Sequence, residues 1–90
     1  MDRSRQAAWQ EVLAAELKRW SAQSYADLVS GLRDVQTYEV ERGSQKYQVE
    51  VELLEQADDY VHIAVAVDDG TLPASLSPLT RTFIKKSVKG

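Results

Sequence analysis

The most constraining feature of this chain is an alternation of apolar and polar residues that begins near residue 36. A period of two is typical of β-strands that bury one face. Residues 36–42 alternate in this way, Gly43-Ser44 follows as a turn signal, and residues 45–55 alternate again. Glycine tolerates the positive φ that a type II′ turn requires at its first position. The pattern therefore predicts a β-hairpin with strands over about 36–42 and 45–55.

A two-residue turn also fixes the register of this hairpin, because it pairs Arg42 with Gln45. The pairs that follow are Val40 with Tyr47, Tyr38 with Val49, and Glu41 with Lys46. The first two pairs are apolar on one face, and the third joins opposite charges on the other. A one-residue slip would break all three matches, so the pattern favours this register alone.

A third strand is predicted over residues 60–68, after a polar break from Gln56 to Asp59. With a loop over 56–60, the apolar pairs are Leu53 with Ile63 and Val51 with Val65. On the outer face, His62 then lies opposite Leu54 and near Glu52. We expect the most buried residues to include Val49, Val51, Ile63 and Val65.

Two helices are predicted before the strands, because the first 34 residues follow a period near 3.6. One covers about residues 4–21 and the other about 24–32, with Ser24 as a capping residue. Their apolar stripes are Trp9, Val12, Leu13, Leu17 and Trp20, and then Tyr25, Leu28, Val29 and Leu32. Two tryptophans on one stripe fit core packing, and a platform for a ligand is the alternative. We expect Trp9, Leu13 and Leu17 to cover the buried strands.

The end of the chain predicts a crossing segment over 71–78, with Pro73 and Pro78, and then a fourth strand over about 80–86. A short helix is the alternative there. Residues 71–90 hold four basic side chains and no acidic one, whereas residues 35–70 hold nine acidic and two basic. We expect this segment to dock beside the acidic strands, with Phe83 against the helices.

Helices grouped before strands predict an α+β fold with one domain over 1–90. In it, two N-terminal helices pack on one face of a three- to four-stranded antiparallel β-meander. The chain has 90 residues, no cysteine and one histidine. This composition excludes disulfides, thiolate chemistry and histidine-rich metal sites, so we expect no cofactor and no metal. No apolar run is long enough to cross a bilayer, and we expect a cytoplasmic protein.

Sequence motifs for chemistry are weak. The pairs Asp58-Asp59 and Asp68-Asp69 lack the alternating spacing of calcium loops and fit turns. Lys85, Lys86 and Lys89 could form a basic tail for nucleic acid, but the net charge of −3 argues against that partner.

The outer face of the predicted sheet is the surface of most interest. It carries Glu39, Glu41, Glu50 and Glu52 together with Leu54, His62, Ala64 and Ala66. A partly solvated sheet face accounts for the acidic residues without any function. The residues Leu54, His62, Ala64 and Ala66 could instead form a contact surface for a partner or a second copy.

The chain also resembles small uncharacterised bacterial α+β domains. In them two helices precede a Tyr-x-Val strand, a Tyr-x-Val-x-Val strand, a strand of valines and a Ser-Pro-Leu-x-x-x-Phe-Ile ending. Here these motifs are Tyr38 to Val40, Tyr47 to Val51, Val61 to Val67, and Ser77 to Ile84. The resemblance implies a closing strand at Phe83-Ile84, and it implies no activity.

Two classes of function follow. With a full set of secondary structure and no catalytic constellation, we expect a non-catalytic interaction or accessory domain that binds a partner protein or forms a weak homodimer. The alternative is a small-ligand-binding protein or enzyme that uses the outer sheet face around His62 and Glu52, since histidine titrates near neutral pH.

Overall fold

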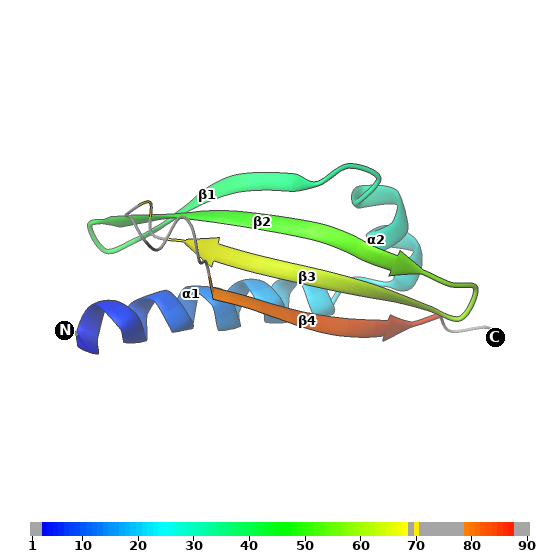
Figure 1. The fold of residues 1–90 in the computed structure, drawn as a ribbon, viewed down its shortest axis with the longest axis horizontal. Helices are drawn as coiled ribbons and strands as arrows, with labels where there is room; N and C mark the ends of the chain where they lie inside the picture. The colour runs from blue at the N-terminus through cyan, green and yellow to red at the C-terminus, as the bar shows by residue number, and fades with distance from the viewer. Residues whose placement is uncertain (1–2, 69, 71–78, 88–90) are drawn as a thin grey trace.

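The computed structural model describes residues 3–68, 70 and 79–87 of the chain, which fold into two helices followed by four strands. The helices are α1 (Arg3–Ser21) and α2 (Tyr25–Gly31) (Figure 1). The strands are β1 (Gln36–Arg42), β2 (Gln45–Gln56), β3 (Tyr60–Asp68) and β4 (Leu79–Lys86). The α+β class and the order of elements predicted from the sequence are confirmed. The proline segment over 71–78 lies outside the described residues.

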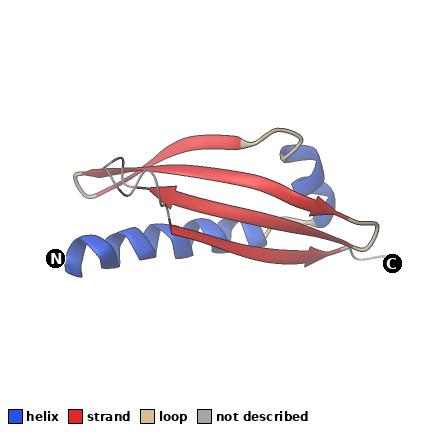
Figure 2. Ribbon diagram, in the orientation of Figure 1, coloured by secondary structure: helices blue, strands red, loops and turns tan. Residues whose placement is uncertain are grey.

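The strands form one antiparallel sheet in the order β1-β2-β3-β4. Both helices lie on the same side of this sheet, behind it in Figure 1 and shown by type in Figure 2. The molecule measures 48 × 20 × 18 Å, because α1 runs along the length of the strands instead of across them. The result is two layers, with one face of the sheet covered by helices. The other face, which no described residue covers, is the open face.

The core lies between the helices and the covered face. In β3 every second residue is fully buried, from Val61 to Val67, and in β2 Tyr47, Val49 and Val51 are equally buried. Val12, Leu13, Leu28 and Leu32 supply the helical side of this cluster. The buried strand residues expected from the sequence are confirmed, and Trp9 and Leu17 pack against them. Burying an aliphatic side chain contributes about 1.5–3 kcal/mol, so this cluster holds the two layers together.

Both tryptophans belong to this packing and form no free platform. They are half-buried against the core, and each indole N–H has a partner. Trp9 Nε1 donates to the carbonyl oxygen of Val67 at 2.7 Å, and Trp20 Nε1 donates to Tyr38 Oη at 2.8 Å. A buried indole requires such an acceptor.

The hairpin register is confirmed throughout, including the pairs Val40 with Tyr47, Tyr38 with Val49 and Glu41 with Lys46. Gly43 has φ +63°, and Ser44 has no positive φ, which fits a type II′ turn. The pairs Leu53 with Ile63 and Val51 with Val65 are also confirmed.

The prediction that His62 lies opposite Leu54 is wrong. His62 pairs with Glu55, and the register shifts between Leu53 and Glu55, which leaves Leu54 as the extra residue of a β-bulge. Strict alternation would have turned the Glu55 carboxylate toward the helices. Burying an unpaired carboxylate is costly, and the bulge avoids that cost by turning Glu55 to the open face.

The fourth strand is confirmed, and Phe83 lies on the covered face opposite Ile63, packed against the core. Among the described residues no ion pair joins β4 to the acidic strands, and the strand beside it is β3. Arg81 and Lys85 pair with Val65 and Val61, so both point to the helix side.

Candidate functional site

The open face carries a row of three side chains, Leu54, His62 and Ile84, on three adjacent strands. His62 on β3 pairs with Ile84 on β4 and with Glu55 on β2, and the bulge residue Leu54 directly precedes Glu55. Leu54 is 48% exposed and Ile84 is 59% exposed. Of the exposed large apolar residues in the described part of the chain, only Val35 is not in this row. The sequence predicted Leu54 and His62 for this surface and missed Ile84.

Beside this row lie two alanines on β3. Ala64 pairs with Glu52 and Thr82, and Ala66 pairs with Glu50 and Thr80. All four predicted contact residues, Leu54, His62, Ala64 and Ala66, therefore share the open face. Together with Ile84 they form what we call the open-face patch.

Carboxylates border the open-face patch on its β2 side. Glu50, Glu52 and Glu55 follow one another along β2, and Glu39 and Glu41 lie beyond them on β1. Glu39 accepts a hydrogen bond from Gln48 Nε2 at 2.9 Å, and the phenol of Tyr60 bonds Glu55, which raises the pKa of that phenol. Among the described residues, Glu50 and Glu52 make neither an ion pair nor a hydrogen bond.

The pairing of His62 with Glu52 that an acid–base mechanism would need is not formed. Glu52 lies opposite Ala64, one row away from His62. No hydrogen bond or ion pair within the described residues orients the imidazole. An unoriented histidine on a sheet face is a poor general base, because catalysis requires the proton to be within hydrogen-bond reach of a fixed ring nitrogen.

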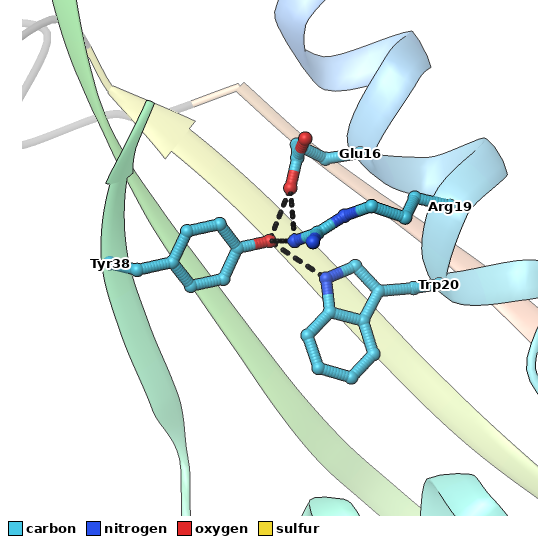
Figure 3. A network of polar contacts seen from close by, with 4 residues as sticks. All are labelled: Glu16, Arg19, Trp20 and Tyr38. Carbon is cyan, nitrogen blue, oxygen red and sulfur yellow. Dashed lines mark hydrogen bonds and ion pairs between the residues drawn. The ribbon is translucent and has the colours of Figure 1, made fainter. Parts of the chain in front are cut away.

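A second cluster, on the covered side, joins α1 to β1 (Figure 3). Tyr38 Oη donates to Glu16 Oε1, and it accepts from Arg19 Nη2 at 2.7 Å and from Trp20 Nε1 at 2.8 Å. Arg19 also forms an ion pair with Glu16 at 2.8 Å and lies 5.2 Å from the Tyr38 ring centroid. Each of the four side chains of this cluster has a hydrogen-bond partner inside the cluster.

The electrostatics of this cluster fit a structural role. Burial raises the pKa of the Tyr38 phenol, and the hydrogen bond to Glu16 raises it further, although Trp20 and Arg19 oppose this. The phenol therefore stays protonated and keeps donating to the carboxylate. Glu16 is only 8% exposed, and a buried carboxylate needs compensation for its charge. Arg19 and Tyr38 provide this compensation through an ion pair and a hydrogen bond. The cluster fastens the edge strand β1 to α1.

The sequence contained a signal for this cluster, namely a carboxylate among the apolar residues of α1. Glu16 falls on the apolar stripe of α1, four residues after Val12 and four before Trp20. A carboxylate at a core position of a helix needs a buried partner, and the half-buried Tyr38 on the facing strand provides it.

Other parts of the described structure give weaker candidates for a functional site. A groove of about 440 Å³ lies between α1 and β4, and its lining includes Ala7, Gln10, Ala14, Leu79 and Arg81. Glu11 and Thr80 also line it, so its lining is mixed polar and apolar. In the described ranges, no three His, Asp or Glu side chains are grouped to hold a metal ion. No helix in those ranges combines the length and the apolar content needed to cross a bilayer.

Lys85 and Lys86 lie on opposite sides of the sheet. Lys85 Nζ donates to the carbonyl oxygen of Ser21 at 3.0 Å, at the end of α1, whereas Lys86 pairs with Tyr60 and so lies on the open face. Lys89 lies outside the described residues. The acidic pairs occur at turns, where Asp68 Oδ1 accepts from the N–H of Gly70 at 2.9 Å; Asp69 also lies outside the described residues.

Comparisons with known proteins give no relative: no family model, no curated protein and no solved structure matches this chain.

Proposed function

We propose that this chain is a protein-interaction domain that binds its partner through the open face. The observation that carries the proposal is the row of Leu54, His62 and Ile84, which places two large exposed apolar side chains on the strands on either side of His62. Contiguous exposed apolar surface bordered by polar residues is typical of interaction sites.

The alternatives have less support. A small-ligand enzyme built on His62 and Glu52 would need a hydrogen-bonded pair, and these residues lie in different rows. Binding of nucleic acid would bring phosphates against the carboxylates of β1 and β2, which repel them. A protein partner needs neither an oriented histidine nor a basic surface.

Site-directed photo-crosslinking tests this proposal. A photoreactive phenylalanine analogue replaces Ile84, which is 59% exposed. In cells that make the protein, we expect one discrete adduct to a partner protein. The matched control carries the same analogue at Lys18, an exposed position on α1, and should give no such adduct.

The captured protein is then identified, purified and titrated against the wild type and Leu54→Asp. We expect the aspartate to weaken binding at least tenfold, because it places a charge in the apolar contact. Adducts that form equally from positions 84 and 18, or an affinity unchanged by Leu54→Asp, would contradict the proposal.

A further inference from the structure

We infer that the occupant of the open face is a cationic amphipathic helix of a partner protein. This inference rests on the proposed function and names the chemistry of the partner. It follows from three properties of the open face: its shape, its lack of free backbone groups and its charge.

The side chains of the open face are smallest at Ala64 and Ala66 in the middle of β3, and we call this low strip the trough. Ala64 and Ala66 are the smallest side chains at their level, and they lie between Glu52 and Glu50 on β2 and Thr82 and Thr80 on β4. Both alanines are half-buried, whereas the flanking residues are exposed. The larger residues His62 and Asp68 lie at the two ends of the trough, and the strand rises by about 20 Å from one to the other, the length of a helix of about 13 residues. The trough therefore suits one helix laid along it, with Leu54, His62 and Ile84 at one end.

The backbone of β2 and β3 is already paired within the sheet on both sides. A ligand on the open face therefore meets side chains and finds no free N–H or C=O groups. Its own backbone groups must be satisfied internally once water is excluded, because an unpaired buried amide is costly. A helix meets this condition and an extended peptide does not.

The charge of the open face selects a basic helix. By register, its described carboxylates are Glu39, Glu41, Glu50, Glu52, Glu55 and Asp68, and its described cations are Lys46 and Lys86. Glu50 and Glu52 border the trough directly and have no partner among the described residues. Lysine or arginine on the flank of a docked helix would pair with them and speed association.

A second copy of this chain fits the open face less well. Two open faces packed against each other would bring the same excess of carboxylates from both sides, with two lysines from each to offset it. Like charges across an interface oppose association. The same argument excludes a surface of anionic lipid.

Three 18-residue peptides test this inference. The first has a Leu/Ala stripe at helical spacing with lysine on its flanks, and the second has the same stripe with glutamate instead. The third keeps the composition of the lysine peptide but has two central prolines, which prevent a helix. Binding to the full chain is measured by fluorescence anisotropy at low salt. Amide chemical shifts locate the peptide on the protein.

The lysine helix should bind at least tenfold more tightly than either other peptide, and it should shift amides of β2, β3 and β4 around the open-face patch. The affinity should fall as salt is raised, because exposed charges are screened. Equal binding of the lysine and glutamate helices, or of the lysine and proline peptides, would overturn the inference.

Variants separate specific charge pairing from general attraction to an acidic protein. Glu50→Gln with Glu52→Gln should weaken the lysine helix about three- to tenfold, in line with two exposed ion pairs. The matched control, Glu11→Gln with Asp34→Asn, removes the same charge outside the open face and should change the affinity less than twofold. An equal loss in both double variants would mean that only net charge matters, and it would contradict the assigned site.

Failure of the inference is distinguishable from failure of the proposed function. A natural partner that is crosslinked at position 84 and is sensitive to Leu54→Asp, but binds as a neutral or acidic surface, would overturn the inference alone. An adduct that joins two copies of this chain would overturn it in favour of a homodimer.

Discussion

The phenol oxygen of Tyr38 contacts three side chains of α1, and no other described atom links β1 to the helices through so many hydrogen bonds. Each partner depends on the others: the carboxylate of Glu16 is nearly buried, and the indole N–H of Trp20 has no second acceptor among the described residues. Within a network of this kind, removing one member leaves the other groups unsatisfied.

Tyr38→Phe should therefore destabilise the fold by about 1–2 kcal/mol, since it leaves a carboxylate and an indole N–H without their shared partner. Chemical denaturation at pH 7 measures this loss. Tyr60→Phe is the matched control, because it removes an exposed phenol from the open side of the sheet. A loss from Tyr38→Phe no larger than that from Tyr60→Phe would show that the network adds nothing to stability.

The same phenol predicts how stability depends on pH. The folded state raises the pKa of Tyr38 above the value near 10 expected of the unfolded chain. Its contribution is thus complete below pH ~10 and is lost as the pH rises toward the folded-state pKa. Wild-type stability should fall as the pH rises above about 10, and this fall should be smaller in Tyr38→Phe. Part of the slope will remain, because Glu55 also raises the pKa of Tyr60.

On β4, Phe83 and Lys85 help to dock the strand against the helices, and Leu79 also packs on the core. The Phe83 ring packs on the core, and Lys85 Nζ donates to the carbonyl oxygen of Ser21 at the C-terminus of α1, where a positive charge is favourable. We expect losses of about 2–3 kcal/mol for Phe83→Ala, about 0.5–1.5 kcal/mol for Lys85→Met and under about 0.5 kcal/mol for Lys86→Met. Equal effects of the two lysine variants in thermal unfolding would contradict the assigned role of Lys85.

At the scale of elements, the hairpin was predictable because the apolar residues of both strands must lie on the same face of the sheet. The alternation from Gln36 to Leu53, together with the two-residue turn at Gly43, leaves a single register that keeps apolar residues together. The bulge at Leu54 was not predictable in this way. The residues around it, Leu-Leu-Glu-Gln, alternate poorly, and the choice depends on where the Glu55 carboxylate can remain solvated.

The candidate site shows the same contrast between regions with regular alternation, which could be predicted, and regions without it. Sequence alternation placed His62, Ala64 and Ala66 on the outer face, but it could not place Ile84 beside them, because the strand pairing of β4 follows a crossing segment without a periodic pattern. The Tyr38 cluster was hidden for another reason. It joins residues 22 apart in the chain, and helix periodicity alone says nothing about which strand faces Glu16.

Alanine substitutions at two glycines should change the stability of the fold in opposite directions. Gly43 has φ +63° in the hairpin turn, whereas Gly31 ends α2 without a positive φ, and a Cβ at either position would meet no atom within 4 Å. Gly43→Ala should destabilise by about 1 kcal/mol because of backbone strain alone. Gly31→Ala should stabilise by about 0.5–1 kcal/mol because alanine favours the helix. Thermal unfolding of both variants checks the signs, and two shifts in the same direction would refute the backbone argument.

At the scale of the whole molecule, the sheet is asymmetric in two directions. From face to face, one side is apolar and covered by helices, and the other is open and acidic. From edge to edge, β3 and β2 hold the buried valines, whereas β1 has no fully buried residue and is fastened to α1 by a polar network. Stability should therefore decrease from the centre of the sheet toward its β1 edge, since local opening follows buried apolar contact.

Native-state amide exchange measures that gradient. We expect the slowest exchange in β3 and in the buried half of β2, and the fastest strand exchange in β1. Exchange over residues 80–86 of β4 should be intermediate, because Phe83 holds that strand on the core.

Tyr38→Phe should speed exchange in β1 more than in β4, because the phenol fastens only the first strand to α1. The matched Phe83→Ala variant should do the reverse. Fast exchange throughout residues 80–86 in the wild type would mean that β4 is not docked, and a uniform change across all strands in both variants would mean that the sheet opens as a single unit.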